Sequence, residues 1–145
     1  SALRKTADLD FGKATPGGGG GTLTVAPDGT GTPGGTVVTL GTTQAAAFEL
    51  ERDLLLDLPV YAGPGGADTI TLTHTGDPTK TLTLRDFTTD FNRTRPVRVG
   101  FVTLYIPAWY LEDTYEFHIG GTIDISADQE PGTYEGEFTV QVDFL

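Results

Sequence analysis

The sequence predicts an all-β protein built from antiparallel strands around a single core. Short runs in which apolar and polar residues alternate recur along the chain, and such alternation is typical of strands with one buried face. The 145 residues include 20 Gly and 9 Pro, which interrupt these runs too often for long helices. Threonine, which favours pleated, half-exposed positions, is abundant. A chain of this length is expected to form one domain, residues 1–145, and to bury roughly 70% of its unfolded surface.

The C-terminal segment, residues 120–145, carries the clearest strand pattern. Ile123 and Ile125 alternate with polar residues, and Pro and Gly in residues 130–133 predict a turn. After this turn, a second alternation places four apolar residues on one face: Phe138, Val140, Val142 and Phe144. We therefore expect residues 120–145 to form a hairpin against which the rest of the chain packs.

The N-terminal segment, residues 1–11, predicts a strand at the edge of a sheet. Lys5 interrupts an otherwise apolar face, as charged residues do on edge strands. The apolar members of that face are Leu3, Ala7, Leu9 and Phe11. The glycine run at residues 17–21 predicts a surface loop, because neither the Lys-Ser/Thr pair nor the helix of a phosphate-binding loop follows it.

Six further strands are expected, at residues 22–26, 36–40, 45–50, 69–73, 81–85 and 97–106. In the strand expected at residues 36–40, Val38 and Leu40 lie on one face and Val37 lies on the other. This pattern suggests that other parts of the protein cover both faces of the strand. The fourth and fifth are joined by turn residues and form a hairpin. In the sixth, apolar residues occupy both parities after Gly100, which indicates a central strand or a bulge at that glycine. Residues 52–58 fit a single helical turn or a change of strand. The expected inward-facing residues of these strands include Leu23, Val25, Phe48, Leu50, Ile70, Leu72, Leu82 and Leu84.

Composition excludes several classes of function. The net charge of −11 argues against nucleic-acid binding, which needs a basic surface. No apolar run has the length of a transmembrane segment. Without cysteine the chain has no disulfide, thiol nucleophile or zinc–thiolate site. The chain begins without Met and shows no signal peptide, as expected of a mature secreted chain or a trimmed one.

One basic cluster stands out in this acidic sequence. It consists of Arg93, Arg95 and Arg98. Such a cluster is either solvated loop charge or an electrostatic contact with an acidic face of a neighbouring subunit. If it is a subunit contact, association should weaken at high salt.

The aromatic residues Trp109, Tyr110 and Tyr115 suggest a glycan or protein contact, or aromatics that close one end of the core. No catalytic residue, metal ligand or cofactor site is expected. Neither His74 nor His118 lies in a recognisable motif, and there is no nucleophile elbow. Among the acids, Glu112 and Asp113 beside Trp109 come nearest to a glycosidase pair.

Three stretches carry a resemblance to a known family: KTADLDFG at residues 5–12, TLTVAPDGT at 22–30 and GGTIDISADQEPGTYEGEFTVQVDF at 120–144. They resemble an uncharacterised bacterial domain family of secreted Gly/Thr/Ala-rich proteins. That family is similar to the spore coat U domain and, more distantly, to pilin subunits of chaperone–usher systems. The likeness spans nearly the whole chain, with a looser match in residues 52–115. The chain lacks the disulfide that is common in pilins.

The resemblance implies an immunoglobulin-like, pilin-like antiparallel β-sandwich that lacks one strand. A donor strand from another copy or a homologous subunit would complete it, with Phe138, Val140, Val142 and Phe144 on one wall of the groove. Residues 1–11 would be the first strand or the donor itself. A periplasmic chaperone and an outer-membrane usher would be partners, and the location would be the periplasm or the bacterial cell surface. The implied function is a structural subunit of a pilus-like fibre or a coat. The alternative is a monomeric or tip-located adhesin module that binds glycans.

Overall fold

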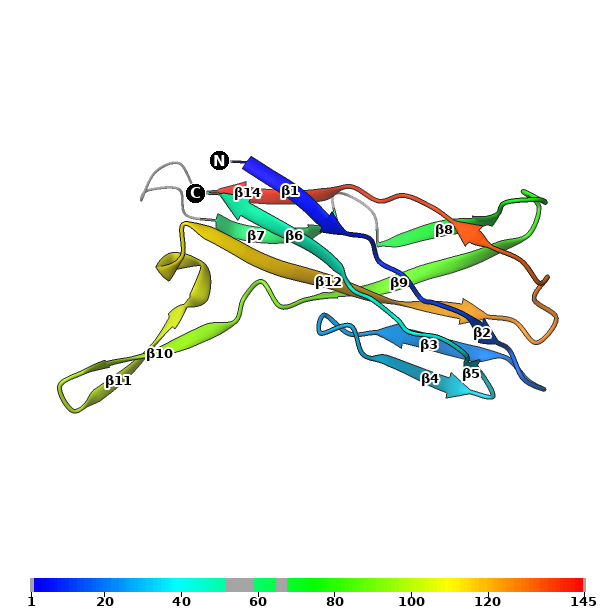
Figure 1. Ribbon diagram of the computed structural model, residues 1–145, viewed down its shortest axis with the longest axis horizontal. Coiled ribbons are helices and arrows are strands. Elements are labelled where there is room, and N and C mark those ends of the chain that lie inside the picture. Colours follow the sequence, from blue (N-terminus) through cyan, green and yellow to red (C-terminus); the bar gives the residue numbers. More distant parts are fainter. Residues whose placement is uncertain (1, 52–58, 65–67, 145) are drawn as a thin grey trace.

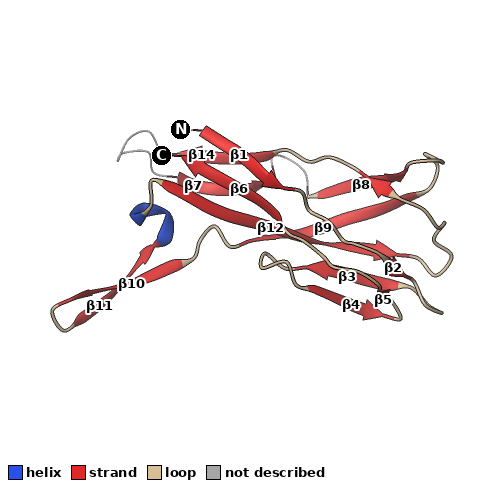
Figure 2. Ribbon diagram, in the orientation of Figure 1, coloured by secondary structure: helices blue, strands red, loops and turns tan. Residues whose placement is uncertain are grey.

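The computed structural model describes residues 2–51, 59–64 and 68–144. Within them the chain forms strands and one short 3₁₀ helix, which confirms the predicted all-β class (Figures 1 and 2). The elements are β1 (Ala2–Ala7), β2 (Ala14–Thr15), β3 (Gly21–Val25), β4 (Gly31–Gly35), β5 (Val38–Thr39), β6 (Ala46–Glu51), β7 (Pro59–Pro64), β8 (Thr69–His74), β9 (Thr81–Thr89), β10 (Thr94–Val99), β11 (Val102–Pro107), η1 (Ala108–Leu111), β12 (Thr114–Ile125), β13 (Tyr134–Glu135) and β14 (Val140–Phe144).

The long strand β12 is the centre of an antiparallel sheet with the order β1-β6-β12-β9-β8-β13. One edge of β12 pairs first with β6 and then, beyond Gly120, with β3, while its other edge pairs with β9. Gly120 lies where one neighbour is exchanged for the other, and a Cβ there would lie 2.0 Å from the carbonyl oxygen of Val25. Only glycine leaves room for this close approach of two backbones.

The C-terminal strand lies in a second layer. β14 pairs with β7 in a sheet of two strands, and Phe138, Val140 and Val142 pack against the core of the main sheet. The result is an antiparallel β-sandwich, as predicted. The expected hairpin at residues 120–145 is wrong, however. Both of its strands form, but β12 and β14 are not neighbours, because both edges of β12 are already occupied by β6, β3 and β9.

Two clusters of buried side chains make up the core. One gathers around Phe48, Tyr115 and Phe117, and the other around Leu23 and Ile123. Three partly buried residues contact both clusters and join them: Leu9, Phe87 and Phe138. Each buried Leu, Ile or Phe side chain stabilises the fold by about 1.5–3 kcal/mol relative to an exposed one. The predicted inward residues Leu23, Val25, Phe48, Leu50, Leu82, Leu84, Ile123 and Ile125 are all buried, and Ile70 and Leu72 are half-buried.

The segment at residues 36–40 differs from its prediction. Val37 is buried in the second cluster, whereas Val38 and Leu40 are 51% and 63% exposed. Only Val38 and Thr39 form strand, and they pair with the two residues of β2. The buried Val37 lies just before this short strand, and within β5 itself Val38 is exposed and Thr39 only half-buried.

The expected strand at residues 97–106 is two strands. β10 and β11 form an antiparallel hairpin that turns at Gly100, where φ is +61°, and Phe101 at the tip is fully exposed. The change of parity in the sequence marks this turn, since glycine readily adopts positive φ. The hairpin of β8 and β9 and the edge strand β1, with its irregularity between Lys5 and Ala7, are both confirmed. The prediction for residues 52–58 lies outside the described residues.

Candidate functional site

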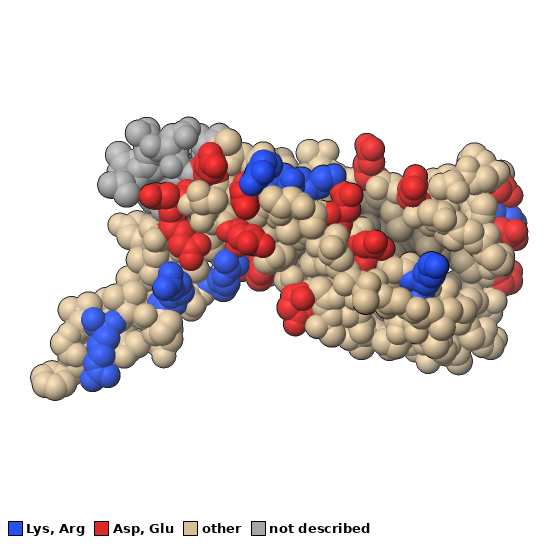
Figure 3. All heavy atoms as spheres, viewed as in Figure 1, with Lys and Arg blue, Asp and Glu red and all other residues tan. Residues whose placement is uncertain are grey.

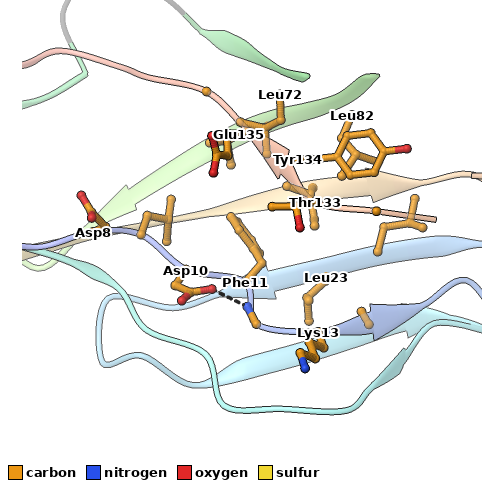
Figure 4. A pocket seen from close by; sticks show the side chains of 18 of the residues that line it. Asp8, Asp10, Phe11, Lys13, Leu23, Leu72, Leu82, Thr133, Tyr134 and Glu135 are labelled. Atoms are coloured by element: carbon orange, nitrogen blue, oxygen red, sulfur yellow. Dashed lines mark hydrogen bonds between the residues drawn. The ribbon is translucent and has the colours of Figure 1, made fainter. Parts of the chain in front are cut away.

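A groove of about 1420 Å³ runs between two segments that are far apart in the sequence. One wall is residues 5–16 and the other is residues 129–138 (Figure 4). Figure 3 shows the hollow on the surface of the molecule. Its floor belongs to the core and includes Leu23, Leu72, Leu82, Leu84, Ile123 and Ile125. The groove is therefore an opening into the apolar interior of the sandwich.

The N-terminal wall is an extended segment bonded along its outer side. Asp10 exchanges two backbone hydrogen bonds of 2.9 Å with Gln44, and Leu40 donates to the carbonyl oxygen of Lys13 at 2.7 Å. Among the described residues, the backbone N–H and C=O groups of Leu9 and Phe11 make no hydrogen bond. Alternate residues of an extended chain direct these groups to opposite sides, so those of Leu9 and Phe11 lie on the groove side.

The C-terminal wall has the same construction. Thr75 donates a backbone hydrogen bond of 2.9 Å to Thr133, and β13 pairs with β8. In the part of the chain that the structure describes, the backbone groups of residues 136–138 are unbonded, and no hydrogen bond joins the two walls. The groove is thus bordered on both sides by unpaired strand edges, which are templates for another strand.

His74 holds the C-terminal wall in place. Its Nδ1 accepts hydrogen bonds from the backbone N–H groups of Gly76 and Asp77 at 2.9 and 3.0 Å. An Nδ1 that accepts requires the ring proton on Nε2, which therefore donates to the carbonyl oxygen of Pro131 at 2.8 Å. The ring also packs edge-on against Tyr134, with centroids 5.2 Å apart. The neutral imidazole links β8 to the loop that borders the groove.

The rim of the groove is predominantly acidic. It carries the carboxylates Asp8, Asp10, Glu130, Glu135 and Glu137, and the two cations Lys5 and Lys13. Lys5 donates to Asp8 at 2.5 Å. This bond raises the pKa of Lys5, and Glu137 on the opposite wall raises it a little further. The field at the rim therefore favours a cationic ligand.

The residues predicted to border a groove lie in different places in the structure. Phe138 lines the groove, whereas Val140 and Val142 pack against the core cluster around Phe48. The side chain of Phe144 lies outside the described residues.

The N-terminal residues of the prediction divide between the edge strand of the main sheet and the wall of the groove. Leu3 and Ala7 lie in β1 and pair with residues of β6, and Leu3 is exposed. Leu9 and Phe11 turn towards the core and line the groove. In this structure the segment is the first strand and one wall of the groove.

The three arginines do not form one cluster. Arg93 lies over the ring of Tyr115 at 4.5 Å and donates to the backbone oxygen of Glu116 at 2.7 Å. Arg95 approaches Glu112 at 3.5 Å. Arg98 donates to the carbonyl oxygen of Gly100 at 3.2 Å. Arg93 therefore belongs to the body of the protein, while the other two belong to the β10–β11 hairpin.

The three aromatic residues form no common platform. Tyr115 is buried, and its hydroxyl donates to the carbonyl oxygen of Phe91 at 2.8 Å. Burial raises its pKa to about 12. Its prediction as a glycan contact is wrong, and the alternative of an aromatic that closes the core applies. Trp109 is half-buried against the core, and Tyr110 is exposed.

Comparison with known proteins places the chain in a family. Residues 2–144 match the domain of unknown function DUF4402. The chain belongs to this family. No curated protein matches it. No solved structure matches it either. Since the match runs from β1 to β14, both walls of the groove are part of the DUF4402 domain.

No group of three His, Asp or Glu side chains among the described residues is arranged to hold a metal ion. Both ring nitrogens of His118 lie beside carboxylates, Asp90 at 2.8 Å and Glu116 at 3.0 Å. In the described ranges no helix has the length and apolar character that a membrane crossing needs.

Sequence reasoning expected a groove in this DUF4402 domain only through the family resemblance, and it missed the course of the two walls and with it the residues Asp8, Asp10, His74 and Tyr134. One signal was available. The residues between Ile125 and Phe138 are too many for a hairpin loop, which commonly has two to five residues. Such a length indicates a segment that crosses between layers, and in the DUF4402 domain that segment forms the second wall.

Proposed function

We propose that the protein is a structural subunit of a bacterial surface fibre or coat, assembled by strand complementation. An extended strand from another copy or a homologous subunit enters the groove between residues 5–16 and 129–138. The observation that carries the proposal is the pair of unpaired backbone edges that face each other over an apolar floor. The proposal assigns no catalytic role to any residue.

The energetics of an incoming strand favour this function. Each main-chain hydrogen bond to a wall contributes about 0.5–1.5 kcal/mol. Apolar side chains that reach the floor add about 25 cal/mol for each Å² removed from water. Ten residues of each wall line the groove, and an extended chain of that length spans about 30 Å, so a strand of six residues, about 20 Å long, fits within it.

The same features explain why an unassembled subunit would need protection. Open edges beside an apolar floor invite aggregation. The sequence resembles the pilin subunits of chaperone–usher systems. By analogy, a periplasmic chaperone would hold the groove until an outer-membrane usher brings the next subunit. Export to the periplasm or the cell surface is part of this proposal.

Filling the groove tests the proposal. Thr133 is exposed and lies across the groove from Phe11 (Figure 4), so Thr133→Trp places an indole in the path of a strand. Thr83→Trp adds the same side chain at an exposed position of β9, between the buried Leu82 and Leu84, and is the control. Cells that produce each form are labelled with an antibody to this chain and viewed by electron microscopy.

We expect labelled filaments or a continuous coat with the unaltered protein and with Thr83→Trp, and their loss with Thr133→Trp. Circular dichroism of the purified variants checks that both remain folded. Normal assembly of a folded Thr133→Trp variant would exclude the groove as the assembly site. Diffuse label with the unaltered protein would exclude a polymer altogether.

A glycan-binding module, monomeric or at a fibre tip, is the second candidate. Tyr110 is exposed beside the half-buried Trp109, with ring centroids 6.1 Å apart, and aromatic faces of this kind bind sugars. A glycan array that compares the unaltered protein with Trp109→Ala tests it. Binding that is unchanged in the variant, or absent from both, removes this candidate.

A further inference from the structure

The β10–β11 hairpin extends away from the body of the molecule (Figure 1). Its register pairs Val97 with Leu104 and Val99 with Val102, and a direct pair shares one face of a hairpin. That face is apolar, and Val99, Val102 and Leu104 are about half exposed or more. A hairpin of two strands is only marginally stable in water by itself. An apolar face on such an element indicates a surface that another molecule covers.

The hairpin also differs from the rest of the chain in charge. Residues 94–107 contain two charged side chains, Arg95 and Arg98, and no acid. The hairpin therefore carries +2, and the remainder of a chain with a total of −11 carries −13. Figure 3 shows this separation, with basic side chains alone on the arm and mainly acidic ones on the body. Two hairpins would repel each other, whereas a hairpin and the acidic body attract.

The groove has the complementary properties. Its floor is apolar and its rim has five carboxylates and two lysines. Among the described residues, the backbone groups of Leu9, Phe11 and residues 136–138 along its edges lack hydrogen-bond partners. Each strand of the hairpin has six residues, or about 20 Å, which is shorter than the walls of about 30 Å. The hairpin leaves one end of the molecule, while the groove lies towards β2 and β8 at the other (Figure 1).

We propose that the β10–β11 hairpin of one molecule docks into the groove of a second copy. This inference rests on the proposed function and names the occupant of its groove. The apolar face with Val102 and Leu104 covers the groove floor, and the acidic rim attracts the positively charged hairpin as a whole. Because the two surfaces differ and lie at opposite ends, each molecule offers one of each. Such a head-to-tail contact builds a filament when its rotation does not close into a ring.

Paired variants of β11 test the role of the hairpin. Val102→Ser with Leu104→Ser removes the part of the apolar face that β11 contributes, without a change of charge. Thr103→Ser with Tyr105→Ser alters the opposite face of the same strand and is the matched control. Sedimentation velocity of the full chain over a range of concentrations measures self-association. We expect the first pair to weaken self-association about tenfold or more, and the control to behave like the unaltered protein.

A mixing experiment tests the head-to-tail geometry. The Val102→Ser/Leu104→Ser variant keeps an intact groove, and Thr133→Trp keeps an intact hairpin. Each alone should sediment as a monomer, and an equal mixture should form a heterodimer that grows no further. A mixture that stays monomeric, a serine pair that associates normally, or an unaltered protein that is monomeric at every concentration would overturn the inference.

Microscopy of the same variants separates this inference from the proposed function. Loss of labelled filaments in both Thr133→Trp and Val102→Ser/Leu104→Ser supports both. Loss in Thr133→Trp alone overturns the hairpin as the occupant and leaves the strand-accepting groove standing. Filaments that survive both changes overturn both ideas.

Discussion

The Nε2 atom of His74 lies 2.8 Å from the carbonyl oxygen of Pro131, so the last residue of β8 fixes the loop that borders the groove. The same ring accepts two backbone N–H groups through Nδ1. When the wall of a groove is already held in the binding geometry, ordering that wall costs less free energy as a strand enters. His74 is therefore expected to matter for both the stability of the wall and the affinity of the groove.

The variant His74→Ala should loosen residues 129–136. It removes three hydrogen bonds and the edge-on contact with Tyr134, and the expected loss in the free energy of unfolding is about 1–2 kcal/mol. Amide hydrogen exchange should accelerate most in this wall and little in β12. Thr71→Ala, at an exposed position of the same strand, is the control. Uniform acceleration across the sheet would contradict a local role.

The variant Tyr115→Phe should destabilise the core although it alters a single atom. The hydroxyl is buried and donates to the carbonyl oxygen of Phe91 at 2.8 Å. Its removal leaves a buried acceptor unsatisfied, at a cost of about 1–3 kcal/mol. Urea denaturation measures the loss. Tyr105→Phe, at an exposed position of β11, should change the midpoint little.

The pKa of Tyr115 also predicts how stability depends on alkaline pH. Burial raises it to about 12 in the folded protein, from a reference value of 10.0. Because the pKa of Tyr115 is raised on folding, the un-ionised hydroxyl contributes to the stability of the fold. This contribution to stability is complete below about pH 10 and is lost as pH rises towards 12. Tyr115→Phe should therefore show a shallower fall in stability across that range. In a titration of tyrosinate absorbance, one of the five tyrosines should ionise last and be absent from the variant. Identical alkaline profiles would contradict this assignment.

The pair of Arg85 and Asp124 should affect stability in acid. Two hydrogen bonds of 2.7 and 2.8 Å join the guanidinium to both carboxylate oxygens, and they lower the pKa of Asp124. Because the pKa of Asp124 is lower in the folded protein, its ionised carboxylate stabilises the fold above the unfolded pKa of about 3.9. This stabilisation is lost as the pH falls through the folded pKa.

Asp124→Asn should therefore cost a small amount of stability at neutral pH and progressively less below about pH 4. Thermal denaturation at a series of pH values measures the difference. Asp86→Asn removes the other and more exposed partner of Arg85 and is the control. A difference that stays constant with pH would exclude the ion pair as its cause.

Alternation in the sequence was enough to predict which residues of most strands face the core, as Leu23, Leu84 and Ile123 show. It was not enough to predict which strands pair. A period of two fixes the faces of a strand but says nothing about its edges. β14 pairs with β7 because β12 already has neighbours on both edges, a fact of the assembled sheet. The course of the groove walls was missed for a related reason, since the two segments that form them meet only in the fold.

The prediction for Val37 and Val38 failed through a local ambiguity. Two adjacent valines do not indicate by themselves which of them faces the core, and the choice depends on what lies beneath the segment. In the fold, Val37 packs against the cluster of Leu23 and Ile125, and the side chain of Val38 points away from it.

Substitution of each valine by aspartate tests this choice of face. Val37→Asp buries an unpaired carboxylate, and we expect a loss of about 3 kcal/mol or more in the free energy of unfolding. Val38→Asp puts the same group at a position that is 51% exposed, and we expect a change within about 0.5 kcal/mol. Because the variants share composition and charge, the unfolded state contributes almost equally to both. Urea denaturation decides between them, and equal losses would mean that both side chains are covered, as the sequence pattern first suggested.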